Sequence, residues 1–362
     1  MSEPIRVLQI VTTMNRGGLE TMLMNYYRNI DRSRVQFDFI EHRPEKSDYD
    51  EDIERLGGHI YRMPRLVPWS RSYRAALKRF FGEHPEYRIV HVHQDCLSSA
   101  ALCAAKECGV PIRIAHSHAA GQDKNWKYLI KLWYKRRIPG YATDLFACGR
   151  DAGDWMFGGA EYRILNNAIS AGQNRYNKEV RDKVRAELGL EGAFLLGLTA
   201  RFSAAKNHLF LLDIFHAVAD REPSARLLLV GDGELRESIK RKAGELGLAD
   251  KVIMTGLRTD VPDLLQAMDV FVMPSNYEGV SLAIVEAQAA GLPCFISDKV
   301  PIDCKKTDLV QQLSLNDSPE VWAEAILGCK GVERRDTFQE IVHAGFDIES
   351  NAEELQEWYL KK

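Results

Sequence analysis

Residues Pro274–Asp298 read PSNYEGVSLAIVEAQAAGLPCFISD. A short apolar strand, Val270–Met273, precedes this stretch, and a polar loop follows that strand. A helical pattern then covers Ser281–Ala290, and Gly291 ends it before the next apolar strand, Pro293–Ser297. The order strand, helix, strand predicts a parallel sheet that is covered by helices.

The same alternation extends along the rest of the chain. It runs from the strand Ile5–Thr13 to a helix near Asp151–Phe157, and it restarts at the strand Ala193–Ala200. The polar segment 170–190 between the two runs is expected to be a linker. A chain of 362 residues suits two α/β domains of about 150–180 residues each.

We therefore expect two doubly wound, Rossmann-like domains, at residues 1–170 and 190–345. Ligands bind at the carboxyl ends of parallel strands, so two such edges facing each other would form a cleft. A last helix, at residues 350–360, is expected to be capped by Ser350 or Asn351.

Composition narrows the class of protein. Hydrophobic residues make up 45% and charged residues 27% of the chain, as in soluble globular proteins. The net charge of −3 argues against a nucleic-acid-binding protein. None of the seven cysteines forms a CxxC pair, which predicts buried thiols in a reducing cytosol. No signal peptide and no apolar run of about eighteen residues is present, so any membrane contact should be peripheral.

The opening stretch carries candidate binding residues. Glu278 lies in the loop and can reach sugar hydroxyls, while Glu286 lies in the helix and can accept hydrogen bonds from a ribose diol. Ser281 can cap the helix, and the N–H groups of Gly279, Val280 and Ser281 would point toward a bound anion. Either glutamate alone would be interpreted as a surface charge. The order of these residues within the stretch 274–298 favours a ligand-binding site instead.

A second candidate segment, TARFSAAKNH, follows the strand Ala193–Ala200. It presents Arg201 and Lys206, two cations that could hold a diphosphate and stabilise a leaving group without a metal. Gly17 and Gly18 follow the first strand and allow a ligand to approach the backbone, although a plain tight turn explains them equally well. No GxGxxG fingerprint is present, which disfavours a dinucleotide enzyme.

Histidines mark the ends of two further strands. His91 and His93 end one strand, and His116 and His118 end the next. A neutral imidazole there could bind a sugar hydroxyl or place an acceptor. Four clustered histidines also raise the alternative of a metal site, but no carboxylate pattern accompanies them, and we expect no metal.

Together these motifs resemble those of the family 4 retaining glycosyltransferases, which have the GT-B fold. The strongest marker is the E-x7-E pattern in EGVSLAIVE, with the adjacent EAQAAGLPCFISD. TARFSAAKN resembles the arginine–lysine segment of the family, and LLLVGDGEL and KVIMTG come after it in the expected order. The opening VTTMNRGGLETMLMN resembles bacterial exopolysaccharide and capsule transferases.

The resemblance implies a retaining, metal-independent hexosyltransferase with a nucleotide-sugar donor, most often a UDP-sugar, and no cofactor. It implies that Arg201 and Lys206 hold the diphosphate. Glu286 would hold the ribose and Glu278 the sugar. The family assigns no protein nucleophile.

Further roles follow from the same resemblance. Gly17 or Gly18 would approach the donor phosphate, and either His116 or His118 would be the cleft histidine. The last helix would pack back onto the first domain. One departure is that Lys206 is followed by an asparagine, which resembles a helix cap, where many relatives have glycine.

Residues 124–137, KNWKYLIKLWYKRR, predict a basic amphipathic helix. Such a helix suits an anionic membrane surface and a lipid-linked or glycan acceptor, which would place the protein on the inner face of the cell membrane. A core-packing helix with a solvated basic face is the alternative. The candidate surface consists of Lys124, Trp126, Lys127, Lys131, Trp133, Lys135, Arg136 and Arg137.

Two rival functions fit the same motifs. One is a non-catalytic sugar-nucleotide-binding subunit of a polysaccharide assembly complex, and the other is a GT-B sugar-nucleotide epimerase. The sequence does not identify the donor sugar, the base, the acceptor, the linkage or the oligomeric state.

Overall fold

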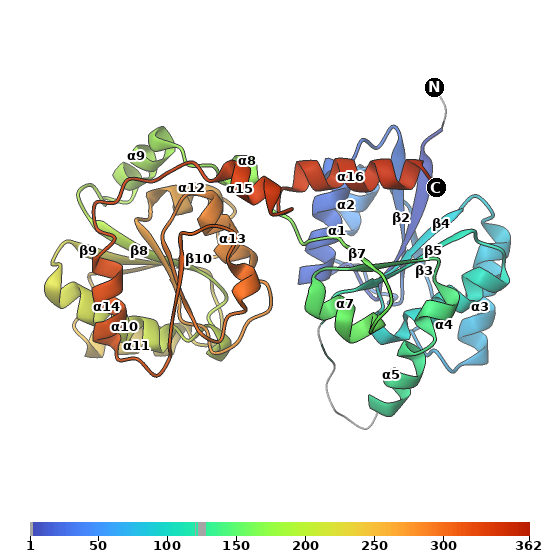
Figure 1. Ribbon diagram of the computed structural model, residues 1–362, viewed down its shortest axis with the longest axis horizontal. Helices are drawn as coiled ribbons and strands as arrows, with labels where there is room; N and C mark the ends of the chain where they lie inside the picture. The colour runs from blue at the N-terminus through green and yellow to red at the C-terminus, as the bar shows by residue number, and fades with distance from the viewer. Residues whose placement is uncertain (1–2, 120, 122–127) are drawn as a thin grey trace. The chain divides into compact units, whose positions relative to one another are not determined.

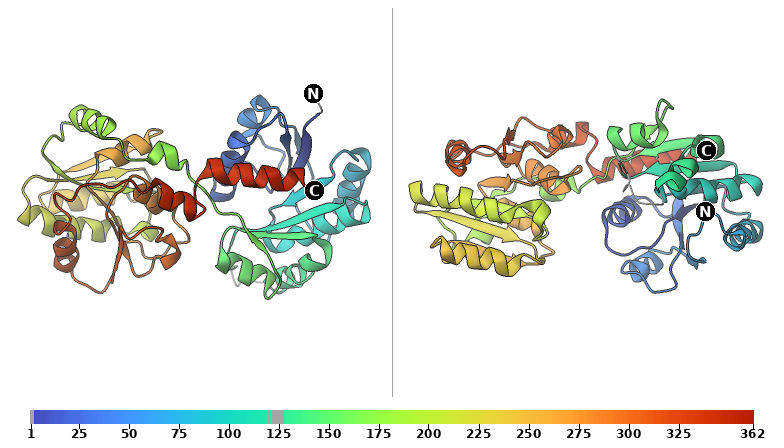
Figure 2. Two further views of the ribbon diagram at one scale, coloured as in Figure 1. Left: turned by 45° about the horizontal axis from the view of Figure 1, so that its top comes forward. Right: turned by 90° about the horizontal axis from the view of Figure 1, so that it is seen from below.

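The computed structural model describes residues 3–119, 121 and 128–362. The chain divides into two compact units, Met1–Ala168 with Ile348–Lys362 and Ile169–Asp347. In each unit a sheet of parallel strands lies between layers of helices (Figure 1, Figure 2). This architecture agrees with the α/β alternation read from the sequence.

Among the described residues, the first unit has a seven-stranded sheet in the order β3-β2-β1-β4-β5-β6-β7. Its strands are β1 (Ile5–Ile10), β2 (Val35–Glu41), β3 (Ile60–Arg62), β4 (Ile89–Val92), β5 (Ile112–Ser117), β6 (Asp144–Ala147) and β7 (Arg163–Ile164). Its helices are α1 (Gly18–Asn29), α2 (Asp50–Arg55), α3 (Arg71–Glu83), α4 (Ser98–Glu107), α5 (Tyr128–Lys135), α6 (Ile138–Tyr141), α7 (Arg150–Phe157) and α16 (Ile348–Leu360), with the 3-10 turn η1 (Asp95–Leu97).

The central strands are apolar on both faces because helices cover both faces of the sheet. In β1, Val7 packs into the core under α1 and α16, while Leu8 and Ile10 pack into the core under α3 and α4. Strand order reverses between β1 and β4, so the loops after these two strands border a topological switch point.

The last helix, α16, belongs to the first unit and packs against α1 and β2 (Figure 1). Tyr359 is fully buried there, with its ring edge against Phe37 at 6.0 Å. The helix begins at Ile348, so the expected cap at Ser350 or Asn351 is wrong. The helix begins two residues earlier than Ser350 because Ile348 is buried in the same core as Tyr359.

In the part of the chain that the structure describes, the second unit has a six-stranded sheet in the order β10-β9-β8-β11-β12-β13. Its strands are β8 (Phe194–Thr199), β9 (Ala225–Val230), β10 (Val252–Gly256), β11 (Val270–Met273), β12 (Cys294–Ser297) and β13 (Val310–Leu313). Its helices are α8 (Ala171–Asn174), α9 (Lys178–Glu187), α10 (His208–Arg221), α11 (Arg236–Glu245), α12 (Val261–Ala267), α13 (Leu282–Ala289), α14 (Pro319–Leu327) and α15 (Phe338–His343), with 3-10 turns η2 (Ala204–Lys206) and η3 (Ile302–Cys304).

Segment 170–190 is not a linker, because α8 and α9 are part of the second unit. Arg181 donates to the carbonyl of Met268 at 2.7 Å, and Arg185 donates to that of Ala267 at 2.7 Å. These bonds satisfy carbonyls at the end of α12, which has no further helical turn to do so. The charged sequence suggested a solvated segment, whereas two of its arginines are mostly buried.

In the sheet of the second unit, strand order reverses between β8 and β11. The loops after these strands therefore border the switch point of this unit. They are the two segments, 200–207 and 274–281, that contain Arg201, Lys206 and Glu278, three of the four charged residues expected to hold the donor.

Candidate active site

The loops after β8 and β11 are joined by an ion pair between Lys206 and Glu278, 72 residues apart in sequence. Both side chains are mostly buried, with 21% and 11% of their surface exposed. Ser275 Oγ donates to Glu278 Oε1 at 3.0 Å, and Asn276 N donates to the carbonyl of Ala205 at 2.7 Å. A cation and a carboxylate therefore lie together at the switch point.

Arg201 lies in the same loop as Lys206 but points into solvent. Its side chain is 75% exposed and pairs with Glu234 at 3.2 Å. Exposed pairs of this kind contribute little to stability, so a phosphate can replace Glu234 at little cost. Arg201 is thus available for a ligand, although it does not contact Lys206.

The GDGE turn after β9 supports the Arg201 loop. A Cβ atom on Gly231 would lie 2.0 Å from the carbonyl oxygen of Ala200, and one on Gly233 would lie 2.5 Å from that of Phe202. Phe202 N donates to Asp232 O at 2.9 Å. The glycines of this motif are needed for close packing of two backbones.

Glu286 lies in the middle of α13 and is half-buried. Within residues 3–119, 121 and 128–362, its carboxylate has no hydrogen-bond or ion-pair partner. Burial raises the pKa of Glu286 to about 7. A carboxylate that is desolvated and has no partner in the protein is suited to accept hydrogen bonds from a ligand.

The start of α13 differs in detail from the expectation. Ser281 is the residue before α13, but its side chain makes no capping bond and contacts Met273 Sδ at 3.8 Å. The N–H of Ser281 donates to Cys304 Sγ at 3.3 Å, so it is not free for an anion. Gly279 and Val280 are exposed, and no described residue accepts from their N–H groups.

Asn207 also occupies the position before a helix without capping it. Its backbone is left-handed, with φ of 54°, and its side chain makes no bond to α10. Asn207 therefore occupies the capping position, as expected, but its side chain does not cap the helix.

In the first unit, the loop after β1 carries Gly17 and Gly18 into α1. A Cβ atom at Gly18 would meet nothing within 4 Å, while one at Gly17 would lie 2.4 Å from Glu20 Oε2. Gly17 is extended, with φ of −147°, so neither glycine is required by a left-handed turn. Open space at Gly18 is compatible with a ligand that approaches the backbone.

The four histidines form one cluster at the ends of β4 and β5. Ring centroids lie 4.3 Å apart for His91 and His93 and 4.1 Å apart for His116 and His118. His116 is only 1% exposed, and its Nε2 has no partner, whereas His118 is half-buried. Of the two candidates for the ligand-facing histidine, His118 is therefore the more accessible one.

His91, His93 and His116 each offer a nitrogen within 4.8 Å of the others, a grouping that could hold a metal ion. Most of these nitrogens already bond elsewhere. His91 Nδ1 lies 2.7 Å from the Tyr359 hydroxyl, and His93 Nε2 lies 2.9 Å from Gln9 Oε1. Both bonds leave the other nitrogen of each ring, as in metal-bound histidines. Those nitrogens lie against neighbouring rings, His91 Nε2 at 3.2 Å from His116 Nδ1 and His93 Nδ1 at 2.8 Å from His118 Nε2, so a metal would have to replace these contacts.

Asp95 is a candidate that sequence reasoning missed. It follows β4 at the switch point of the first unit, and its φ of 46° is left-handed. Its Oδ1 is buried without a partner, and burial raises its pKa. Among the described residues, only Asp95 and Asn207 have positive φ without being glycine. Both lie in loops at a switch point, where strained backbone often marks function.

Comparison with known proteins identifies the family. The model of glycosyl transferases group 1 matches residues 193–329, and that of Glycosyltransferase Family 4 matches residues 16–156. EpsF of Bacillus subtilis, named as a glycosyltransferase, is 37% identical over 98% of this chain and 96% of its own. The chain belongs to the family 4 glycosyltransferases.

Other relatives agree. Capsular polysaccharide biosynthesis glycosyltransferase CapH of Staphylococcus aureus is 22% identical over 99% of each chain. A galactosyltransferase of Escherichia coli, which uses UDP-Gal and α-D-GlcNAc-diphosphoundecaprenol by its name, is 28% identical over 59% of this chain and 58% of its own. Anabaena HepE in complex with UDP has a TM-score of 0.74 at 18% identity, over 97% of this chain and 94% of its own, which shows the GT-B fold.

Helix α5 of this glycosyltransferase presents apolar side chains to solvent. Leu129 is 76% exposed and Trp133 is 49% exposed, while Lys135 lies over the Trp155 ring at 4.4 Å. Tyr134 of the same helix is buried in the core, so the alternative of a core-packing helix holds for that side chain, whereas Leu129 and Trp133 are apolar residues that it would have buried. Arg136 and Arg137 follow the helix, and the expected surface residues Lys124, Trp126 and Lys127 lie outside the described residues.

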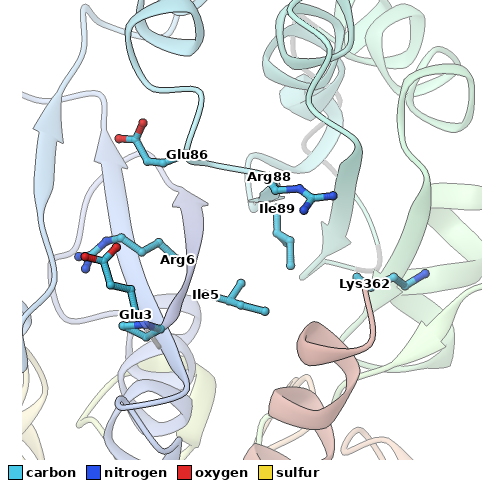
Figure 3. Close-up of a pocket in the computed structure, with 8 residues that line it drawn as sticks. Glu3, Ile5, Arg6, Glu86, Arg88, Ile89 and Lys362 are labelled. Carbon is cyan, nitrogen blue, oxygen red and sulfur yellow. The ribbon is translucent and has the colours of Figure 1, made fainter. Parts of the chain in front are cut away.

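A cavity of about 510 Å³ lies at the opposite edge of the first sheet, where β1 and β4 begin (Figure 3). Arg6, Arg88 and Lys362 line it together with Glu3 and Glu86. Arg6 is already paired with Asp38 at 2.5 Å. The cavity is far along the strands from their carboxyl ends and is not part of the candidate site.

The support that GDGE gives to Arg201 can be tested with Gly233→Ala. The new Cβ would collide with the backbone of Phe202, so the Arg201 loop must shift. We expect UDP affinity to fall at least about tenfold, or about 1.4 kcal/mol. Isothermal titration calorimetry measures this.

Gly244→Ala is the matched control, because it lies in α11 of the same unit with open space around it. Alanine there should leave UDP affinity unchanged and raise stability by about 0.5–1 kcal/mol. Equal UDP affinity in both variants would contradict the supporting role of the turn.

Proposed function

We propose that this glycosyltransferase moves a hexose from a UDP-sugar to a lipid-linked or glycan acceptor in bacterial surface polysaccharide biosynthesis, with retention of configuration. The observation that carries the donor part is the Lys206–Glu278 pair at the switch point of the second unit, with the unpartnered Glu286 on the following helix. These three groups match the diphosphate, the sugar and the ribose of one nucleotide-sugar.

The charges of the site support a reaction without a metal or cofactor. Departure of a nucleoside diphosphate leaves negative charge on the phosphates, and Lys206 and Arg201 are the nearby cations that can stabilise it. Glu278 holds the Lys206 side chain in place before the donor binds. Because a carboxylate competes with phosphate for the lysine, Glu278 then becomes free to accept from sugar hydroxyls.

The acceptor class rests on the relatives and on the first unit. The Escherichia coli relative acts on a sugar-diphosphoundecaprenol by its name. Asp95 and His118 lie at the switch point of the first unit, and both can accept hydrogen bonds from sugar hydroxyls. We assign no nucleophile, because no carboxylate here has an established position at the anomeric carbon.

Membrane contact through α5 completes the proposal. Within the described residues, no helix is both long enough and apolar enough to cross a bilayer. Leu129, Ile130 and Trp133 are exposed side by side on a helix of eight residues, followed by Arg136 and Arg137. Apolar side chains flanked by cations suit peripheral binding to the anionic inner face of the cell membrane.

Turnover tests the donor site. With a UDP-sugar panel and a polyprenyl-diphosphate-sugar acceptor, Lys206→Ala and Glu278→Gln should each release UDP at least about tenfold more slowly, a loss of about 1.4 kcal/mol. Lys242→Ala is the control, since it removes a comparable ion pair with Asp213 on a different part of the same unit. Wild-type rates in the two site variants would reject the assignment, and binding of UDP without any turnover would favour a non-catalytic subunit.

The raised pKa of Glu286 predicts a pH-dependent affinity for UDP. Below about pH 7 the carboxyl is mostly protonated in the free protein, whereas the ribose diol needs the ionised form. UDP binding should therefore weaken as pH falls, by up to about tenfold per unit below pH 7, and should release a proton. Calorimetry in buffers of different ionisation enthalpy measures the proton release. Glu286→Gln should lose the part of the release that comes from the carboxyl, and the part that remains is due to titration of the phosphate. An identical pH profile in both proteins would exclude this role.

Vesicle binding tests the α5 surface. Replacing Leu129 and Trp133 together by serine removes exposed apolar area and should weaken sedimentation with phosphatidylglycerol vesicles about tenfold or more. Leu257→Ser is the control, because Leu257 is 83% exposed in the second unit. Unchanged binding of the double variant would mean that α5 is not the docking helix.

A further inference from the structure

Gln9 connects the histidine cluster to the central strand of the first sheet. It is fully buried on β1, and its Oε1 lies 2.9 Å from Nε2 of His93, which follows β4. Nδ1 of His93 lies 2.8 Å from Nε2 of His118, which follows β5. A single hydrogen-bonded chain therefore crosses three neighbouring strands.

The chemistry of the amide oxygen fixes the direction of this chain. In the structure the Gln9 amide presents Oε1 to His93, and its Nε2 is buried with no partner among the described residues. An amide oxygen can only accept, so with the amide in this orientation His93 carries its proton on Nε2. A neutral imidazole has one N–H, so Nδ1 of His93 is then an acceptor. His118 must donate to it from Nε2, which leaves His118 Nδ1 without a proton.

Both imidazoles are neutral, as this deduction requires. Burial and the neighbouring histidines lower the pKa of His93 well below its usual value, and burial lowers that of His118 to about 3. A second proton, which would make either ring a donor at both nitrogens, is therefore absent at neutral pH.

The unprotonated nitrogen of His118 is the one that a ligand can reach. Nδ1 of His118 has no hydrogen-bond partner in residues 3–119, 121 and 128–362. It is also not one of the fully buried side-chain atoms that lack a partner. The backbone N–H of the same residue lies near Asp95 and partly offsets the rise in the pKa of its carboxyl. Two acceptors, Nδ1 of His118 and the Asp95 carboxylate, thus lie at the switch point of the first unit.

We infer that Gln9 is a positioning residue that acts through His93 to hold His118 as its Nε2–H tautomer, so that Nδ1 accepts a hydrogen bond from a hydroxyl of the sugar substrate. The second part rests on the proposed function, whereas the tautomer is a property of the free protein. The consequence is selectivity for a hydroxyl donor, because a group that only accepts finds no proton at this nitrogen.

The tautomer is tested by two-bond ¹H–¹⁵N correlation NMR of the full chain with ¹⁵N-labelled histidine, assigned with His118→Gln. We expect His118 to show a protonated Nε2 and an unprotonated Nδ1. A proton on Nδ1 would overturn the inference, because it would mean that the Gln9 amide and every bond in the chain run the other way. Stoichiometric zinc in the purified protein, with ligand-type shifts for His91, His93 and His116, would also overturn it.

Gln9→Met tests the positioning role, because methionine has a similar size and no amide oxygen. His118 should then populate both tautomers, and kcat should fall at least about tenfold with the KM for the donor less affected. Gln36→Met is the matched control, since Gln36 is a buried glutamine of β2 that bonds the carbonyl of Leu56 rather than a histidine.

The outcomes separate the inference from the proposed function. A mixed tautomer in Gln9→Met with a normal kcat would overturn the role in turnover, and an unchanged tautomer would overturn the role of Gln9. Absence of transfer by the wild type with every donor would instead reject the proposed function, while the spectrum of the wild type would still decide the tautomer. If Gln9→Met does not fold, the wild-type spectrum is sufficient to contradict the proton direction.

Discussion

The parallel pairing of β8 with β11 is the constraint on which the donor site depends. Val270 pairs with Leu196 and Phe271 with Gly197, so the loops that follow these strands emerge side by side. Gly197 also leaves room for the Met268 side chain, whose Sδ would lie 2.1 Å from a Cβ atom at that position. Lys206 and Glu278 meet only as a consequence of this pairing.

Desolvation sets the chemical state of the groups at both switch points. The same burial that raises the pKa of Glu286 to about 7 lowers the pKa of His118 to about 3, since a low-dielectric environment disfavours the charged form of either group. The histidines are therefore hydrogen-bonding groups of defined direction. Glu286 is partly protonated at neutral pH, and a ligand with hydroxyl donors can displace that proton.

Helices α16 and α5 of the first unit differ in what they contact. Helix α16 returns from the end of the chain and places Tyr359 2.7 Å from His91, so the last helix contributes to the core beneath the histidines. Helix α5 instead leaves Leu129 and Trp133 in solvent. Tyr134 of the same helix is buried in the core of the unit, so the helix packs on one side and leaves these two apolar side chains on the other.

The sequence by itself determined the fold class, the family and the order of the motifs, because apolar periodicity and turn residues are local signals. It identified Glu278, Glu286, Arg201 and Lys206 from residue type and spacing. It misjudged segment 170–190, where arginines that bond buried carbonyls have the composition of a solvated helix. Only the tertiary structure decided that Lys206 pairs with Glu278, that Asp95 belongs to the candidate site, and that His118 is more accessible than His116. These facts depend on strand order and on burial, which arise from contacts between residues far apart in the chain and leave no local pattern to read.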